Sequence, residues 1–418
     1  MGETIPVVII GAGQAGLAVS YLLTRAGVPH TVLERGAIGE SWRSQRWDSF
    51  CLNTPNWANN LPGLEFNADA PDAFEHRDVL VSYLKRYADT FDLPVRQHTP
   101  VTRLEKLSTG EYVVHTGTGT LRARAIVLAN GSMSRPRVPE MARELASGIL
   151  SIPAGSYRSA DALPDGAVLV VGTGQSGCQV AEDLLRNGRK VFLSASRVAR
   201  VPRAYRGRDI VTWMRDVGLW DDRVDELEDP STQFAAQPQV SGTDGGHTVS
   251  LQSLARDGAT LLGRVTAIRG SSITLRGDLL ECIAFADEKS QFYKTAIDKW
   301  IDDHGVAAEP ARADPGEPPL PDLGGSDRLR ELDLRAEGVG SVIWCTGFDA
   351  DWSWVEVDVF DEEGRPRHQE GVTDARGLYF VGHPWLSRRK SGILYGVTDD
   401  AERIVDHLLR ELTPAEAN

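Results

Sequence analysis

Two glycine fingerprints of the form G-x-G-x-x-G constrain the fold of this chain more than any other feature. They occupy residues 11–16 and 172–177, and each follows an apolar run and precedes a pattern with helical periodicity. One such fingerprint is weak evidence for a nucleotide site, but two in matching strand–turn–helix context argue against coincidence. The sequence therefore predicts an α/β fold with two Rossmann-like dinucleotide-binding domains.

The first unit predicts a site for a dinucleotide with an unphosphorylated ribose, FAD or NAD. Residues 7–10 form a continuous apolar run, as in a parallel strand that is buried on both faces. The next predicted strand, 30–33, ends at an acidic residue about twenty positions after the fingerprint, where a carboxylate can accept hydrogen bonds from ribose hydroxyls. The residues predicted to bind this nucleotide are Gly11, Gly13, Gly16 and Glu34.

The second unit lacks a carboxylate at the corresponding position. Its second strand, 190–193, leads to Ser196 and Arg197, and a hydroxyl with a guanidinium would bind a 2'-phosphate through charge-assisted hydrogen bonds. This site is predicted to prefer NADPH. Arg200, Arg203, Arg206 and Arg208 follow, and for the last two a solvated surface loop is an equally good interpretation. The residues predicted to bind the second nucleotide are Gly172, Gly174, Gln175, Ser176, Gly177, Ser196 and Arg197.

Composition and charge exclude several function classes. The formal net charge of −14 argues against nucleic acid or an anionic membrane as the main partner. Residues 7–23 are apolar, but they carry a fingerprint at their centre and lack a basic leading region, so a buried strand and helix is expected there instead of a membrane span. The four cysteines are far apart and show no C-x-x-C spacing, which predicts a reducing cytoplasm and no redox dithiol. The histidines show no ligand spacing, so no metal site is expected.

With these residues in place, the chain resembles the flavin-containing monooxygenase family (class B). The likeness rests on both fingerprints, Glu34 and the segments 39–43, 344–348 and 377–382, and it is weakest across 217–325. It is similar to bacterial soluble flavin-dependent oxidoreductases and, more distantly, to plant indole-3-pyruvate monooxygenases. The resemblance implies FAD on the first fingerprint and NADPH on the second.

The resemblance also implies domain limits and further site residues. The FAD-binding domain would be discontinuous, over 1–160 and 335–418, and the NADPH-binding domain would cover 161–334 with an insertion or lid at about 217–325. A final helix is expected to open at 396–401 with Thr398 or Asp399 as its N-cap, pointing toward the flavin. The additional cofactor-binding residues are Arg35, Trp42, Arg43 and Asp399, and Asn53 is the catalytic candidate that would stabilise a peroxyflavin.

The implied activity is that of an FAD-containing, NADPH-dependent monooxygenase that forms a C4a-(hydro)peroxyflavin. Its partners would be molecular oxygen and a small organic substrate, with nitrogen or sulfur the favoured atom; a homodimer stays open. Oxygenation of Baeyer–Villiger type or of a 2-oxo acid is the alternative. His383 is a candidate for lining the substrate pocket, although packing is the simpler role.

One departure from the family keeps a second alternative open. Tyr157 matches an aromatic residue of the family's linker motif, but Pro153 stands where a histidine is expected four residues earlier. Proline removes a donor and stiffens a link between domains, which favours retaining a flavin oxidase or dehydrogenase as an alternative. The cysteine spacing argues against a disulfide reductase, and the two intact fingerprints argue against a non-catalytic redox sensor.

Overall fold

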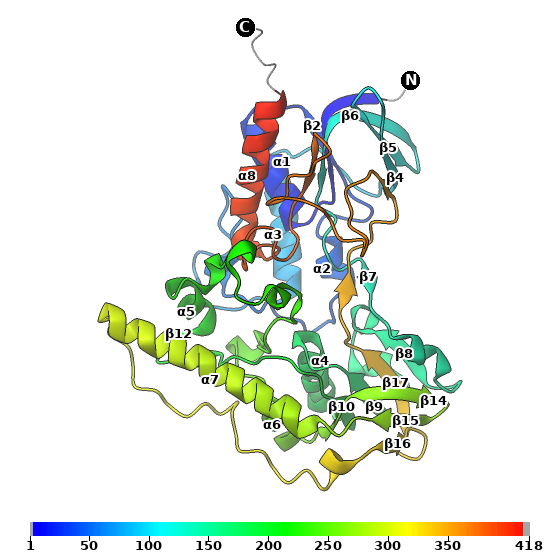
Figure 1. The fold of residues 1–418 in the computed structure, drawn as a ribbon, viewed down its shortest axis with the longest axis vertical. Coiled ribbons are helices and arrows are strands. Elements are labelled where there is room, and N and C mark those ends of the chain that lie inside the picture. Colours follow the sequence, from blue (N-terminus) through cyan, green and yellow to red (C-terminus); the bar gives the residue numbers. More distant parts are fainter. Residues whose placement is uncertain (1–2, 413–418) are drawn as a thin grey trace.

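Each fingerprint follows a parallel strand, and the two strands belong to two different sheets. In a computed structural model that describes residues 3–412, Gly11 follows β1 (Glu3–Ile10) and Gly172 follows β9 (Ala167–Val171). The two sheets form two lobes that are stacked along the long axis of the molecule (Figure 1). The predicted α/β fold with two dinucleotide-binding domains is thus confirmed.

The first sheet has eight strands in the order β19-β4-β5-β6-β1-β2-β3, with β20 paired to β6. β1 runs parallel to both β2 and β6, so the carboxyl ends of these three strands meet at one edge of the sheet. That edge carries Gly11 and Glu34. The strands besides β1 are β2 (His30–Leu33), β3 (Val95–Arg96), β4 (Val101–Lys106), β5 (Tyr112–Thr116), β6 (Gly119–Leu128), β19 (Val355–Glu356) and β20 (Leu378–Phe380).

Three long helices belong to the first lobe. They are α1 (Gln14–Arg25), α3 (Arg77–Thr90) and α8 (Leu394–Leu412), and α1 and α8 lie side by side (Figure 1). α8 buries Val397, Ala401, Ile404 and Leu408, whose spacing places them on one helix face. The short helix α2 (Glu40–Ser44) follows β2.

The expected N-cap of the last helix is wrong. α8 begins at Leu394, so Thr398 and Asp399 lie inside the helix. The reason is that the buried stripe starts at Leu394 and Val397, whose burial favours a helical turn before the predicted start. An isolated glycine at 396 is tolerated within this packed stretch.

The second sheet has five strands, all parallel, in the order β13-β10-β9-β17-β8. Besides β9 these are β8 (Leu150–Pro153), β10 (Val191–Ser194), β13 (Thr260–Leu262) and β17 (Val339–Trp344). β8 lies before residue 161 and β17 lies after residue 334, so the second sheet includes strands on both sides of the predicted domain limits of 161–334. Pro153 ends β8, which is an edge strand, and edge strands are where sheets tolerate proline.

The region 217–325 contains more helix and strand than the sequence predicted. It contains α6 (Leu251–Arg256), β13, β14 (Val265–Arg269), β15 (Ser272–Leu275) and the 26-residue helix α7 (Leu279–His304). Its strand β13 completes the second sheet, so most of this region belongs to the body of the second domain. Sequence analysis missed α7 because polar Ser290 interrupts its buried stripe. Residues 306–325 contain no helix or strand.

Two chain crossings connect the lobes, and they pair with each other. β7 (Arg135–Pro136) and β18 (Phe348–Asp349) form a short antiparallel ladder, which Arg137 reinforces by donating from Nε to Asp349 at 2.7 Å. Helix α4 (Gln175–Arg186) of the second lobe faces the segment of the first lobe that carries Asn53. Among residues 3–412, no helix has the length and apolar character needed to cross a membrane.

Candidate functional site

The first glycine of each fingerprint allows two strand ends to come close together. Gly11 has φ +110° and Gly172 has φ +103°, a region that only glycine adopts without strain. A Cβ at either position would overlap a carbonyl oxygen, of Ala129 after β6 or of Cys345 after β17. A Cβ at Gly16 or Gly177 would overlap the carbonyl of the first glycine itself. The two loops therefore share one construction.

The middle glycine of each fingerprint faces open space. A Cβ at Gly13 or Gly174 would have no heavy atom within 4 Å outside its immediate neighbours. These residues are the N-caps of α1 and α4, and neither helix has a side-chain cap or an acidic residue in its first turn. Uncapped N–H groups at a helix N-terminus bind phosphate well. Both loops thus fit the pyrophosphate of a dinucleotide.

A side chain at the end of the neighbouring strand supports each loop. Glu34 is 7% exposed, and its carboxylate accepts from the backbone N–H of Ala12 at 2.8 Å and of Gly36 at 2.9 Å. In the second lobe Ser196 Oγ accepts from the N–H of Thr173 at 3.0 Å. Carboxylate oxygens can accept several hydrogen bonds, so Glu34 retains capacity for a ribose hydroxyl. Ser196 is engaged with its own loop.

A cavity of about 570 Å³ joins the two fingerprints. The predicted site residues that line it are Gly11, Gly13, Glu34, Arg35, Trp42, Asn53, Gln175 and Ser176. Those that do not line it are Gly16, Arg43, Gly172, Gly174, Gly177, Ser196, Arg197 and Asp399. Arg43 is paired with Glu40 at 2.7 Å, and Asp399 with Lys390 at 2.7 Å. These two ion pairs account for the position of both side chains outside the cavity.

Asn53 connects the two lobes at the cavity. Its Nδ2 donates to Gln175 Oε1 at 3.0 Å, and its Oδ1 accepts from Gln179 Nε2 at 2.9 Å. Gln179 also donates to the carbonyl of Val240 at 2.6 Å. The amide of Asn53 is thus held in one orientation by α4. Gln179 was not predicted, because its spacing from the fingerprint matches an ordinary helix position.

Arg46 is a second cavity residue that the sequence did not single out. Its guanidinium lies 5.1 Å from the Trp42 ring centroid and 5.4 Å from that of Phe50, and Nη2 contacts Met133 Sδ at 3.1 Å. No carboxylate within residues 3–412 forms an ion pair with it. Burial lowers the pKa of Arg46 to about 10, which leaves it charged at neutral pH. A cation without an ion pair among the described residues therefore faces the cavity from the first lobe.

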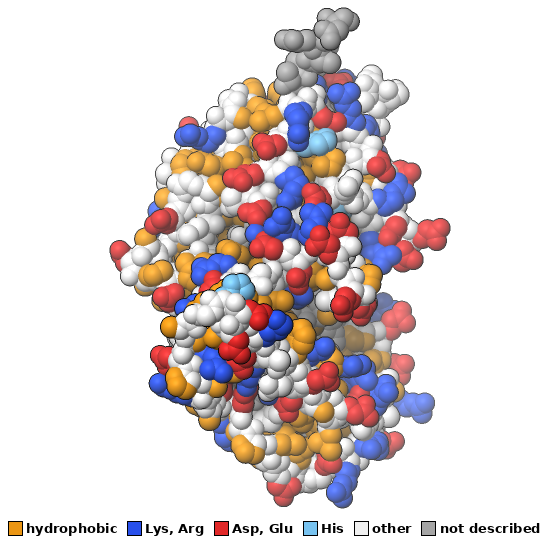
Figure 2. Space-filling model, turned by 60° about the vertical axis from the view of Figure 1, so that its left-hand side comes forward, with side chains coloured by type: hydrophobic (Ala, Val, Ile, Leu, Met, Phe, Trp, Pro, Cys, Tyr) orange, Lys and Arg blue, Asp and Glu red, His pale blue; other side chains and the backbone are white. Residues whose placement is uncertain are grey.

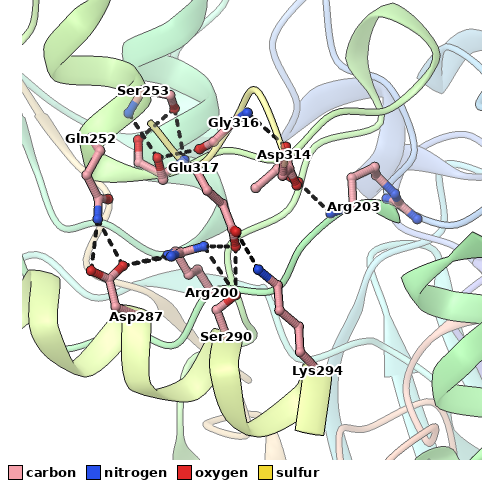
Figure 3. Close-up of polar contacts among 12 residues, drawn as sticks. Arg200, Arg203, Gln252, Ser253, Asp287, Ser290, Lys294, Asp314, Gly316 and Glu317 are labelled. Atoms are coloured by element: carbon pink, nitrogen blue, oxygen red, sulfur yellow. Dashed lines mark hydrogen bonds and ion pairs between the residues drawn. The ribbon is translucent and has the colours of Figure 1, made fainter. Parts of the chain in front are cut away.

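Two arginines of the basic cluster are buried in ion pairs. Arg200 bonds to Asp287 at 2.7 Å, to Glu317 and to Ser290 (Figure 3). Arg203 pairs with Asp209 at 2.6 Å, and its backbone N–H donates to Thr248, as part of the network that holds residues 314–317 (Figure 3). Both side chains are at most 7% exposed. They therefore stabilise the second lobe and are not free to bind a phosphate.

Arg197 differs from the other arginines of this cluster. Arg206 pairs with Asp298 at 2.5 Å and Arg208 with Asp216 at 3.2 Å, whereas Arg197 has no ion pair within the part of the chain that the structure describes. Its exposed guanidinium lies 4.4 Å from the ring centroid of Phe285 on α7. Lys289 Nζ, also without an ion pair among the described residues, lies 5.6 Å from the same ring. Two cations without an ion pair among the described residues thus lie near one aromatic ring beyond the end of β10.

His383 packs beside the cavity without lining it. Its neighbours Gly382 and Pro384 line the cavity, but the imidazole lies against the Trp352 ring at 5.1 Å between centroids. Burial, with a smaller contribution from His368, lowers the pKa of His383 to about 4. Its Nε2 has no hydrogen-bond partner in the described residues. The packing role proposed for this histidine agrees with this arrangement.

The cysteines and acidic groups that the structure describes form no disulfide and no cluster suited to a metal ion. Cys51, Cys178, Cys282 and Cys345 are all free thiols, and burial raises the pKa of Cys178, Cys282 and Cys345. In residues 3–412, no group of three or more His, Cys, Asp or Glu side chains is placed to hold a metal ion.

Comparisons with known proteins agree with this fold. A family model described as pyridine nucleotide-disulphide oxidoreductase matches residues 8–213. The chain is 30% identical to an uncharacterized CzcO-like oxidoreductase of Geobacillus kaustophilus, over 98% of this chain and 99% of the relative. It is 30% identical to the probable indole-3-pyruvate monooxygenase YUCCA4 of Arabidopsis thaliana, over 96% of this chain and 90% of the relative. A flavin-containing monooxygenase from Stenotrophomonas maltophilia has a similar fold, with a TM-score of 0.67, 19% identity and coverage of 98% and 99% of the two chains.

Proposed function

The chain belongs to the flavin-containing monooxygenase family, and from that premise we propose that it uses FAD, NADPH and molecular oxygen to oxygenate a small organic substrate at nitrogen or sulfur. It is an oxidoreductase of the flavin monooxygenase type, and FAD and NADPH are the cofactors of this family. The proposal concerns the reaction and the residues that serve it.

The observation that carries the proposal is the single cavity that both fingerprints reach. Gly13 and Glu34 line it from the first lobe, and Gln175 and Ser176 line it from the second. One nucleotide on each loop would bring a flavin and a nicotinamide into the same enclosed space. Hydride transfer requires this proximity.

The residues of this chain would bind, orient and exclude water. Gly11, Gly13 and the N-terminus of α1 would hold the FAD pyrophosphate, with Glu34 on the ribose. When bound, the flavin supplies hydride acceptance and oxygen activation, which no side chain here provides. Asn53, fixed by Gln175 and Gln179, would present its amide to the reacting edge of the flavin.

The NADPH site would depend on Arg197. Among the five arginines that follow the second unit, it alone has no carboxylate partner within residues 3–412. The guanidinium of Arg197 and the ammonium of Lys289, which both lie near the Phe285 ring, could bind a 2'-phosphate through charge-assisted hydrogen bonds. Lys289 therefore joins Arg197 in the proposed phosphate site, although α7 was not predicted.

Stopped-flow spectroscopy tests the reaction directly. The purified yellow protein is reduced anaerobically with NADPH and then mixed with oxygenated buffer. We expect NADPH to bleach the flavin, and we expect oxygen to produce a transient band that differs from the spectra of both reduced and oxidised flavin. Direct return of the oxidised spectrum, with hydrogen peroxide formed in equal amount to the NADPH consumed, would refute monooxygenation and favour an oxidase.

A further inference from the structure

The cavity has a wall that no cofactor-binding motif accounts for. Six apolar side chains form it, and we call this group the apolar wall: Val201, Ile210, Val211, Met214, Trp220 and Val240. They also belong to one hydrophobic cluster, so they form a continuous surface. Three of them lie on the helix α5 (Ile210–Asp216). Sequence analysis identified no site in this part of the chain.

The apolar wall lies next to the proposed catalytic amide. Gln179 Nε2 donates both to Asn53 Oδ1 at 2.9 Å and to the carbonyl of Val240 at 2.6 Å. A Cβ at Gly242 would overlap the carbonyl of Leu52, so the chain after the wall packs tightly on the segment that carries Asn53. A molecule that contacts the wall would therefore lie close to Asn53.

No charged side chain lines the cavity from the wall. The charged lining residues are Glu34, Arg35, Glu40, Arg46 and Asp351. None of them comes from residues 201–240. The guanidinium of Arg46 lies near Trp42 and Phe50 and donates to Met133 Sδ and to the carbonyl of Gln45, all in the first lobe.

Two cations that adjoin the wall are occupied elsewhere, and one of them is Lys390, whose backbone N–H donates to the carbonyl of Trp220 at 3.1 Å. Arg215 follows Met214, but it lies 4.6 Å from the Trp57 ring centroid and pairs with Asp216 at 2.9 Å. Lys390 pairs with Asp221 at 2.9 Å and with Asp399 at 2.7 Å. Neither side chain lines the cavity.

The polar groups of the wall are also satisfied. Trp220 Nε1 donates to the carbonyl of Val211 at 3.1 Å, and the amide of Gln179 is used as described above. A carboxylate placed against these six side chains would lose hydration without gaining an ion pair or a hydrogen bond from them, since Arg46 and the exposed Gln237 line the cavity outside the wall. Such a transfer is strongly unfavourable.

Resting on the proposed function, we propose that the apolar wall is the substrate compartment and that it selects uncharged apolar molecules, such as thioethers, while rejecting carboxylates. The 2-oxo acid alternative is thereby disfavoured for this chain, even though a relative carries the name of an indole-3-pyruvate monooxygenase. An alkyl amine is also disfavoured at neutral pH, because such amines are protonated there.

A matched pair of probes tests this selection by binding alone. Methyl phenyl sulfide and 4-(methylthio)benzoate share the reacting sulfur and differ by one carboxylate. Their dissociation constants are measured by calorimetry on the oxidised FAD-loaded protein, without NADPH. We expect the neutral sulfide to bind at least about 10-fold more tightly, the ratio that about 1.4 kcal/mol produces. Equal binding, tighter binding of the carboxylate, or binding of neither probe would overturn the proposal.

Substitutions on the wall locate the effect. Met214→Lys should reverse the preference toward the carboxylated probe, and Met214→Leu should preserve the wild-type preference. Val79→Lys on α3 is the matched control, because Val79 is 39% exposed and does not line the cavity. A reversal by Val79→Lys as well, or an unchanged preference in a folded Met214→Lys, would contradict the assignment.

The outcomes distinguish this inference from the proposed function. Selective binding of the sulfide without its oxygenation by NADPH and oxygen would refute the monooxygenase reaction and leave the compartment in place. Oxygenation of a carboxylated substrate in preference to the sulfide would refute the selection by the apolar wall and leave the monooxygenase reaction in place.

Discussion

Lowering the pH from 7 to 5 is expected to destabilise this protein through one buried side chain, His383. The imidazole is 9% exposed, packs against Trp352 and leaves Nε2 without a hydrogen-bond partner in residues 3–412. Burial lowers its pKa from 6.5 to about 4. A proton that this ring accepts in the folded state must therefore enter an apolar environment.

The sign and size of the effect follow from this difference in pKa. Between pH 6.5 and 4 the unfolded chain binds a proton at this residue and the folded chain does not, so stability is present above pH 6.5 and is lost as the pH falls toward 4. Each pH unit in this window costs about 1.4 kcal/mol. The folded state should therefore lose about 2 kcal/mol through His383 between pH 7 and pH 5.

Urea unfolding of the FAD-loaded protein at pH 7 and pH 5 measures this loss. His383→Phe removes the titrating ring and keeps an aromatic side chain of similar size, so its unfolding free energy should fall by about 2 kcal/mol less than that of the wild type over the same interval. His98→Asn is the matched control, because His98 is exposed and its φ of +53° suits asparagine. An identical pH dependence in wild type and His383→Phe would refute the assignment of this loss to His383.

Two further predictions concern the two nucleotide sites, and a third concerns an ion pair on α4. Gly11→Ala should abolish FAD retention, measured by flavin absorbance after purification, because its Cβ would overlap a backbone carbonyl. Gly27→Ala, at a position with φ +68° and open space around it, should keep FAD; equal loss of FAD in both variants would show that backbone strain, and not the overlap, is the cause. Arg197→Ala should weaken NADPH binding about 10- to 100-fold and leave NADH binding unchanged. Arg206→Ala should change the binding of neither nucleotide, because the guanidinium of Arg206 is paired with Asp298. An equal loss of affinity for both nucleotides in Arg197→Ala would contradict a 2'-phosphate contact. The pKa of His247 is raised, chiefly by its hydrogen bond to Glu182 on α4, so the stabilisation by this pair is present below about pH 6.5 and is lost as the pH rises through the higher folded pKa. His247→Gln should therefore lower the urea midpoint more at pH 6 than at pH 9, and equal lowering at both pH values would refute this.

The sequence by itself determined the features whose physical cause is local. Gly11 and Gly172 need a positive φ, and this need is visible as a glycine in a fixed spacing after an apolar run. Glu34 follows the second strand of the first unit, and the uncharged Ser196 follows the second strand of the second unit. The sequence could therefore predict that the two sites differ in their preference for an unphosphorylated or a 2'-phosphorylated ribose. These inferences depend on neighbours within about one βαβ unit.

The tertiary structure alone decided which of these residues are available and what surrounds them. Arg197 and Arg200 look equivalent in sequence, but only Arg200 meets Asp287 and Glu317, because α7 and the residues after it fold back over the second lobe. The apolar wall likewise depends on the packing of residues 201–240 beside Asn53. Ion pairs and cavity walls of this kind join residues far apart in the chain, and no local periodicity encodes such contacts.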